Sequence, residues 1–334
     1  MARKSDDKIT LMTRNLYQGV DLSPLATATN PTEFFKAVGA AYNRMQATNF
    51  LERAKVLAGE IVRASPDLIG LQEAVLFRTQ IPADGPTTPA TNVSYDFIQI
   101  LVDALKDRGV HYTTAVVQTG FDIEAPGSFA TGPMDVRLTD RDAILVRENI
   151  KDFGLSNAQG AQVAAKSSFP SPFGSVNFPC SWVSVDVTFR GGNKVRIIST
   201  HLEPISPSIQ ISQATELLNG PGNTRLPSIL IGDFNSNADG TGTQTYPNLI
   251  NAGFKDAWTL RGQGNGSTCC QRADLLNPES TLNRRIDLAL FRGDVKVQSV
   301  QLTGNTTKER TPSNHWPSDH AGLVTKLKLT VPKN

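Results

Sequence analysis

The chain has 334 residues, of which 39% are hydrophobic and 19% charged, and 33 basic residues nearly balance 31 acidic ones. This length allows one large domain or two medium ones. No run approaches the roughly 18 consecutive apolar residues of a membrane span, and no basic block indicates nucleic-acid binding, although a neutral total is compatible with a local basic patch.

The first elements are predicted from apolar patterning. Residues 8–14 are typical of a strand. Apolar residues at helical spacing predict one long helix over residues 31–63, which Pro66-Asp67 ends. A short strand follows at 68–71, and a second amphipathic helix is expected at 95–106.

The rest of the chain is richer in strand signals. Helical spacing returns only at residues 210–218. Short apolar runs predict strands, in chain order, at 112–117, 143–146, 182–189, 195–200, 229–231, 286–291 and 323–329.

Three segments rich in Gly, Pro, Ser and Thr separate these elements, at 81–94, 121–135 and 154–180, and we expect surface loops or lids there. Strands outnumber helices, and several follow one another at hairpin spacing. This pattern favours an α/β fold of mixed sheets covered by helices, with residues 1–7 as a polar tail and residues 8–330 as a single domain.

The start of the chain and its cysteines bear on the compartment. Residues 1–7 lack the apolar core of a signal peptide. The cysteines are Cys180, Cys269 and Cys270, without a Cys-x-x-Cys pair. Adjacent cysteines rarely bridge each other, so the sequence leaves two cysteine states open with equal weight: a disulfide from Cys180 to Cys269 or Cys270, or three buried reduced thiols. We expect a secreted or periplasmic mature chain, or otherwise a cytoplasmic one.

Polar side chains follow the predicted strands. The clearest case is the run Ile229–Ile231, after which Gly232 precedes Asp233 and Asn235. Side chains alternate along a strand, so Asp233 and Asn235 point the same way. This pair can handle water at a phosphate, but Asp and Asn after a strand are also common turn residues. The other strand-end polar residues are Asn15, Glu73, His201, Asp287, Asp319 and His320.

These motifs, in this order, resemble the endonuclease/exonuclease/phosphatase superfamily, which includes deoxyribonuclease I, apurinic endonucleases, neutral sphingomyelinases and inositol-polyphosphate phosphatases. The resemblance runs from about residue 8 to residue 328 and indicates a deoxyribonuclease I-like, bacterial-type member. It implies a four-layer α/β sandwich in which two packed mixed sheets are flanked by helices. The motifs are Thr-Arg-Asn15-Leu, Leu-Gln-Glu73, Ser-Thr-His201-Leu-Glu203, Gly-Asp233-Phe-Asn235, Arg285-Ile-Asp287 and Ser-Asp319-His320.

The resemblance assigns metal binding to Asn15, Glu73 and Asp319. These side chains offer hard oxygen ligands, which suit Mg²⁺ or Mn²⁺ and suit zinc poorly. Such a metal polarises a phosphoryl oxygen and stabilises the leaving oxygen.

The same resemblance assigns the catalytic roles. Asp233 activates the attacking water and Asn235 holds this water or a phosphate oxygen. His201 and His320 donate hydrogen bonds to the phosphate. The remaining roles go to Asp287, which orients His320, to Asp140 or alternatively Asp142, which orients His201, and to Arg141, which contacts the phosphate or forms a surface ion pair.

The function expected is a metal-dependent phosphodiesterase, monomeric, acting by direct attack of an activated water. Its substrate is either nucleic acid or a phospholipid or small phosphodiester. A phosphomonoesterase on a small or inositol phosphate, and an inactive binding module of the same fold, are the alternatives. Two other kinds of site are disfavoured. An EF-hand loop that began at Asp233 would need Gly at position 238 and Glu at position 244, where this chain has Ala238 and Gln244. A serine hydrolase would need a Gly-x-Ser-x-Gly motif, which is absent from the sequence.

Two groups of side chains bear on the substrate. A nuclease groove would use arginines, for which the candidates are Arg14, Arg44, Arg78, Arg137, Arg284 and Arg285. Lipid contact would use aromatic residues of the Gly/Pro-rich segments, for which the candidates are Phe121, Phe169, Phe173 and Phe178.

Overall fold

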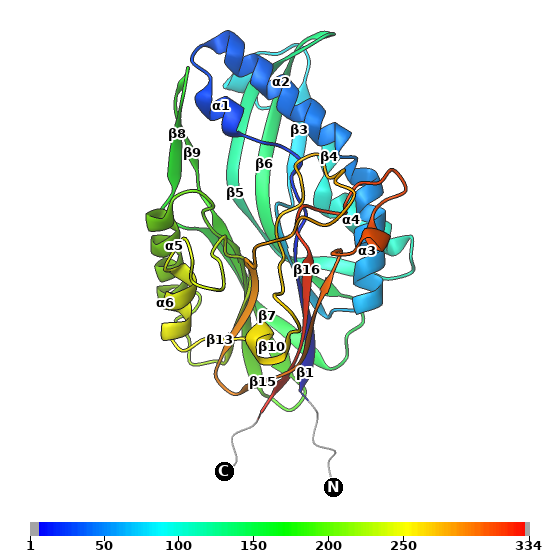
Figure 1. Ribbon diagram of the computed structural model, residues 1–334, viewed down its shortest axis with the longest axis vertical. Helices are drawn as coiled ribbons and strands as arrows, with labels where there is room; N and C mark the ends of the chain where they lie inside the picture. Colours follow the sequence, from blue (N-terminus) through cyan, green and yellow to red (C-terminus); the bar gives the residue numbers. More distant parts are fainter. Residues whose placement is uncertain (1–6, 331–334) are drawn as a thin grey trace.

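The computed structural model describes residues 7–330, so residues 1–6 of the expected N-terminal tail lie outside the described part. Two β-sheets pack face to face, and helices cover their outer faces (Figure 1). Among the described residues no helix is long and apolar enough to cross a membrane.

The larger sheet is mixed. Its strands β1 and β2 run parallel, and the other pairs are antiparallel. In spatial order it contains β15 (Val295–Thr303), β16 (Gly322–Leu329), β1 (Lys8–Asn15), β2 (Leu68–Gln72), β6 (Gly132–Arg147), β3 (Leu76–Gln80) and β4 (Asn92–Asp96), with β5 (Tyr112–Phe129) paired to β6.

The second sheet is also mixed, with β11 and β12 as its parallel pair. In spatial order it contains β13 (Lys255–Asp256), β14 (Asp287–Arg292), β12 (Ser228–Asp233), β11 (Lys194–His201), β10 (Ser181–Phe189) and β7 (Phe153–Gln162). A separate hairpin of β8 (Ser167–Ser171) and β9 (Gly174–Phe178) projects beyond it (Figure 1).

Strand alternation divides the apolar side chains between the layers. Leu11 of β1 and Ile197 of β11 lie in the core between the sheets, whereas the adjacent Met12 and Ile198 pack under helices on opposite outer faces. The expected four-layer sandwich is therefore confirmed. The larger sheet is covered by α2 (Pro31–Ala47), α3 (Phe50–Ala64) and α4 (Phe97–Lys106), and the second sheet by α5 (Pro207–Asn219) and α6 (Thr245–Asn251).

The single helix expected over residues 31–63 is wrong, because the structure has two helices there. The break falls at Thr48 and Asn49, and Asn49 has a left-handed φ of +49°. Its side chain accepts a hydrogen bond from the Glu52 backbone N–H and so caps α3. The apolar spacing continues through the break, which is why periodicity did not reveal it.

The loop expected at 81–94 is confirmed up to residue 91, with one short 3₁₀ turn in it, but the loops expected at 121–135 and 154–180 are largely wrong. β5 and β6 extend as a hairpin to the turn at Phe129 and Gly132, and residues 154–180 contribute β7, β8 and β9. These strands are partly solvated and carry Pro126 and Pro170 within them. Proline is tolerated at such sheet edges, and half-exposed strands lack the continuous apolar runs of the central strands. Shorter elements are α1 (Ser23–Thr27), α7 (Ala257–Arg261), and the 3₁₀ turns η1 (Gly85–Thr87) and η2 (Thr307–Glu309).

Candidate active site

Strand register brings catalytic candidates together across the second sheet. His201 at the end of β11 pairs with Asp233 of the parallel strand β12. Asp233 in turn pairs with Asp287 at the start of β14, and His201 pairs with Ser181 of β10 on its other side. The row exists because each of these strands ends, or begins, at the same edge of the sheet.

Asp233 lies at the centre of this row and is 1% exposed. Its Oδ2 atom is 3.6 Å from Nε2 of His201 and 3.7 Å from Nε2 of His320. Its Oδ1 accepts a hydrogen bond from the Asn235 backbone N–H at 2.9 Å. One carboxylate oxygen therefore faces both imidazoles, while the other is used to hold the turn.

The backbone around Asp233 is unusual. Gly232 has φ of +144°, and a Cβ atom there would lie 2.0 Å from the carbonyl oxygen of Thr200. Asn235 has φ of +50°, and its side-chain Nδ2 donates to the carbonyl of Leu202. A non-glycine residue in this region is uncommon and often marks a functional turn. These constraints explain the Gly-Asp-Phe-Asn order of the sequence.

The larger sheet supplies the second half of the site. Asn15 ends β1, and Glu73 follows β2 in a left-handed conformation with φ of +50°. The Asn15 Nδ2 donates to Glu73 at 3.0 Å and to Asp233 at 3.2 Å. The backbone N–H of Gln18 donates to the other Glu73 oxygen at 2.7 Å. The Asn15 side chain thus links the two sheets across the site.

The carboxylates on this side fit a divalent cation. Burial, with the nearby carboxylates of Glu73 and Asp233, raises the pKa of Asp319 to about 7 despite the opposing charge of His320. Buried like charges of this kind are relieved by a bound cation, and carboxylates are the ligands that Mg²⁺ and Mn²⁺ prefer. Asn15 contacts Glu73, and the charge of Glu73 acts on Asp319, but the Asn15 side-chain oxygen accepts a hydrogen bond from the Tyr17 N–H. A direct Asn15 ligand would require this amide to turn over.

The Asp233, Asp287 and His320 side chains also form a close cluster, with ligand atoms within 4.8 Å of one another. The His320 Nδ1 lies 2.8 Å from Asp287 Oδ2, however, so this ring nitrogen is already partnered. The pairing fixes the tautomer and orientation of His320. Burial alone would lower the pKa of His320, but the charges of Asp287 and Asp319 raise it well above its usual range.

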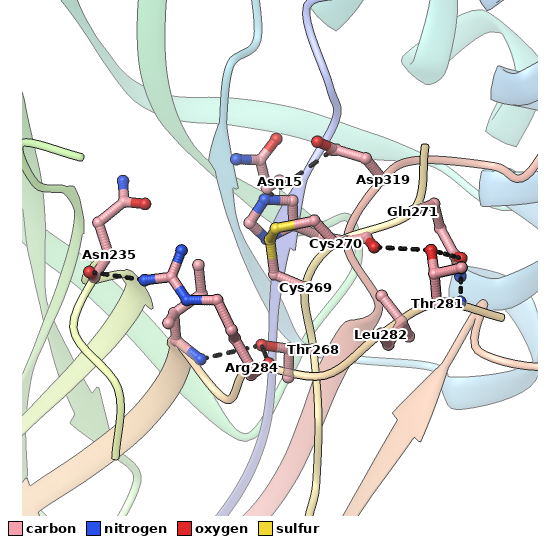
Figure 2. The surroundings of a disulfide bond; sticks show 12 residues. Asn15, Asn235, Thr268, Cys269, Cys270, Gln271, Thr281, Leu282, Arg284 and Asp319 are labelled. Atoms are coloured by element: carbon pink, nitrogen blue, oxygen red, sulfur yellow. Dashed lines mark hydrogen bonds and ion pairs between the residues drawn. A yellow bond between two sulfur atoms is a disulfide. The ribbon is translucent and has the colours of Figure 1, made fainter. Parts of the chain in front are cut away.

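His201 is also held in its charged form. Burial acts to lower its pKa, but the surrounding carboxylates, with Asp233 first and Glu73 next, raise it to about 9. The raised pKa values favour the protonated form of both rings, in which each ring nitrogen can donate a hydrogen bond to an anion. Figure 2 shows part of this site, with Asn15 and Asp319 on one side and Asn235 on the other.

The structure brings both acidic candidates for orienting His201 toward it. Asp142 is buried and accepts a hydrogen bond from the Ser181 hydroxyl. Asp140 lines the cavity, and its Oδ1 atom is buried without a hydrogen-bond partner. Burial raises the pKa of Asp140 to about 6, against the charge of His201. Asp142 also has a buried Oδ1 without a hydrogen-bond partner, so the two acids differ chiefly in that only Asp140 lines the cavity.

Arg141 has other partners than the expected phosphate. Its guanidinium donates to the carbonyls of Ala74 and Val75 and pairs with Asp96 at 2.6 Å. It therefore braces the loop that follows Glu73 and does not line the cavity. The alternative expected for Arg141 was a surface ion pair, and the structure shows an ion pair with Asp96.

The arginine candidates for a nuclease groove are mostly used elsewhere. Arg14 is fully buried, pairs with Glu60 at 3.3 Å and donates to the carbonyl of His320. Arg78 and Arg137 pair with Asp122, and Arg285 pairs with Asp256. Among the six candidates only Arg284 lines the cavity.

Arg53 is a supporting residue that sequence reasoning missed. It is buried, and its guanidinium donates to the backbone carbonyls of Leu16, Tyr17, Thr48 and Pro317. These bonds tie the segment after Asn15 to the segment before Asp319. The only feature of the sequence that could have revealed this role is that Arg53 lies in an otherwise apolar stripe of α3.

Neither cysteine state considered from the sequence, a disulfide to Cys180 or three reduced thiols, is found. Cys269 and Cys270 are joined to each other, and Cys180 is free and half-buried. The backbone of Cys269 pairs with both Arg284 and His320, so the disulfide forms part of the cavity wall between Asp319 and Arg284 (Figure 2). Arg284 donates to Asn237 and to the backbone carbonyl of Asn235.

Comparison with known proteins is consistent with this site. The model of the Endonuclease/Exonuclease/phosphatase family matches residues 40–320. The chain therefore belongs to this family, whose members hydrolyse phosphoester bonds and in general depend on a divalent metal. A search of curated proteins found no match.

Solved structures share the fold at low sequence identity. A family member from Bacteroides thetaiotaomicron superposes with a TM-score of 0.62 at 15% identity, over 98% of this chain and 100% of that one. A mannosyl-6-phosphatase from the same species gives 0.59 at 17% identity, over 96% and 99%. The human nocturnin catalytic domain, solved with bound sulfate, gives 0.53 at 18% identity, over 97% and 94%.

Proposed function

We propose that this protein is a metal-dependent phosphodiesterase that hydrolyses a P–O ester bond by direct attack of water. The observation that carries the proposal is the position of Asp233. Its Oδ2 faces the Nε2 atoms of His201 and His320 and accepts a hydrogen bond from Asn15, which also donates to Glu73. Burying these charges costs stability, and an inactive binding module would have no use for the arrangement.

The reaction divides among the protein's own side chains. Asp233 accepts a proton from the attacking water as its oxygen forms a bond to phosphorus. His201 and His320 donate hydrogen bonds to the phosphate oxygens, where negative charge builds in the transition state. The bond from phosphorus to the leaving oxygen then breaks, and this oxygen takes up a proton from solvent water. Asp287 keeps His320 in the orientation that donates from Nε2.

The metal expected at this site is Mg²⁺ or Mn²⁺, held by Glu73 and Asp319. When bound, it polarises the phosphoryl oxygen and stabilises the leaving oxygen. Asn15 and Arg53 keep the two carboxylate-bearing segments in place.

The charge of the cavity favours a diester over a monoester. Among the described residues the cavity is lined by one arginine, two histidines and eight acidic residues. A phosphodiester carries one negative charge, whereas a phosphomonoester carries about two at neutral pH and is repelled more strongly. The acidic residues are Asp21, Glu73, Asp84, Glu124, Asp140, Glu203, Asp233 and Asp319.

A substrate panel with and without EDTA tests the proposal. It contains methyl p-nitrophenyl phosphate and bis-p-nitrophenyl phosphate as diesters and p-nitrophenyl phosphate as the monoester, each with Mg²⁺ or Mn²⁺. We expect hydrolysis of the diesters that EDTA abolishes and that added metal restores. Metal-independent turnover, a preference for the monoester, or no turnover of any substrate would each contradict the proposal. The Asp233→Asn variant, purified in parallel, controls for contaminating phosphatases.

A further inference from the structure

The site continues into an apolar space. One cavity of about 1060 Å³ extends from Asp233, His201 and His320 to the region between α1, α2 and the β8–β9 hairpin. This volume lies at the upper end of the range of about 300–1,000 Å³ for ligand pockets. We call the part beyond the catalytic residues the apolar chamber, and its aromatic lining consists of Phe34, Phe35, Tyr42, Phe77, Phe121, Phe169, Phe173 and Phe178.

The aromatic walls are joined directly to the catalytic strands. Phe178 ends β9, and the chain then runs through Cys180 to Ser181, which pairs with His201. Phe121 lies in the bulge of β5 between Thr119 and Asp122, whose partners on β6 flank Asp140. The rings of Phe121 and Phe178 meet at 5.0 Å. The inner end of the chamber therefore borders the position of the reacting phosphate.

The outer wall closes through aromatic contacts. Phe173, at the tip of the β8–β9 hairpin, stacks on Phe35 of α2 with ring centroids 5.6 Å apart, and meets Phe34 edge-on at 5.7 Å. The hairpin belongs to neither large sheet (Figure 1). Phe173 is nevertheless 62% exposed, and Ile205 at the same cavity is 67% exposed. Exposed apolar side chains around a cavity indicate an apolar ligand.

The charges of the cavity argue against a polynucleotide. Nucleic-acid grooves need several Lys or Arg contacts to successive phosphates, but among the described residues Arg284 is the only such side chain in the lining. Arg78 of β3 and Arg137 of β6 both pair with Asp122, and Arg137 also lies 3.8 Å from Glu124, so both arginines have acidic partners. This distribution of charge suits a substrate with a single phosphate group that carries an uncharged substituent.

We propose that the apolar chamber receives the hydrocarbon chain of a lipid-like phosphodiester, taken up one molecule at a time, while its phosphate lies between His201 and His320. This inference rests on the proposed function and gives its substrate class. Binding is favourable because the hydrocarbon chain leaves water and contacts the aromatic lining. The affinity therefore grows with the number of buried methylene groups.

A matched pair of soluble substrates tests the inference. Methyl and octyl p-nitrophenyl phosphate share the reacting phosphorus and leaving group and are compared below the micelle concentration, with Mn²⁺. Full burial of one methylene group corresponds to about a fourfold gain. We expect kcat/KM to be at least about tenfold higher for the octyl ester, through a lower KM. Equal values for the two esters would overturn the chamber assignment and leave the phosphodiesterase proposal standing, whereas no hydrolysis of either would refute the phosphodiesterase itself.

Variants locate the effect. Phe173→Ser, at an exposed position with little risk to folding, and Phe178→Ser, at the inner end, are expected to reduce the octyl-to-methyl ratio several-fold. Leu51→Ser on α3, which is 53% exposed and outside the cavity, is the control and should keep the ratio. An unchanged ratio in both phenylalanine variants, or hydrolysis of plasmid DNA faster than of the octyl ester, would overturn the inference.

Discussion

The two ends of the cavity are built in different ways. The catalytic end lies on strand ends of the two central sheets, where register fixes His201, Asp233 and Asp287 in one row. The apolar chamber is built from α1, α2, the separate β8–β9 hairpin and residues of β3, β5 and β6 of the larger sheet (Figure 1). The strand ends therefore hold the groups that react, and the surrounding helices and hairpins hold most of the groups that we propose select the substrate.

The largest effect is expected at the catalytic end. Asp233→Asn keeps the size of the side chain but removes the proton acceptor, so kcat on a diester should fall by about 10³-fold or more. Thermal unfolding close to that of the wild type would show that the fold is intact. A loss of less than tenfold would mean that another group activates the water.

Asp287→Asn should have a smaller effect at the same end. The substitution weakens the 2.8 Å contact that orients His320, and changes of this kind cost about 10- to 100-fold in activity. We expect the loss in kcat with KM little changed, in steady-state assays with either alkyl ester. A loss in KM alone would place Asp287 outside the chemistry.

The acidic partner of His201 can be tested by pH. His201 must be protonated to donate, and since its pKa is raised to about 9, kcat should fall as pH rises through about 9. The Asp140 carboxylate stabilises the charged ring, so Asp140→Asn should move this alkaline limb to lower pH. The exposed Asp239→Asn, outside the cavity, is the matched control. A limb that stays in place while activity falls would make Asp140 a purely structural residue.

The smallest effect concerns the one arginine of the lining. Arg284→Ala should raise KM about tenfold or less, because it removes one partly exposed contact to the phosphate. Raising the salt from about 50 to 200 mM should weaken substrate binding only a few-fold, whereas six to ten phosphate contacts would lose about 10³–10⁵. Arg225→Ala, exposed and outside the cavity, is the control. A steep salt dependence would favour a nucleic-acid substrate.

The two ends also differ in how well the sequence predicted them. Asp233, Asn235 and His201 follow buried apolar runs, so their place at strand ends could be predicted from periodicity and from the family motifs. Phe121, Phe173 and Phe178 lie in half-exposed hairpins that resemble Gly/Pro-rich loops in sequence. Their convergence with α2 depends on tertiary packing over long sequence distances, which a local pattern does not contain.

Polar side chains show the same limit. Arg141 follows Asp140 in a strand, so it points to the opposite face and binds the loop after Glu73. Arg14 and Arg53 are buried ties between segments far apart in the chain. A sequence identifies such residues as cations but does not reveal which carbonyl or carboxylate each will meet.

A crystal structure with Mn²⁺ and methyl(octyl)phosphinate, a diester analogue that has no P–O–C bond to hydrolyse, tests the account most directly. We predict phosphinate oxygens within hydrogen-bond distance of Nε2 of His201 and His320, Mn²⁺ on Glu73 and Asp319, and the octyl chain between α2 and the β8–β9 hairpin. A phosphinate bound away from both histidines, or an octyl chain directed into solvent with the chamber empty, would contradict it.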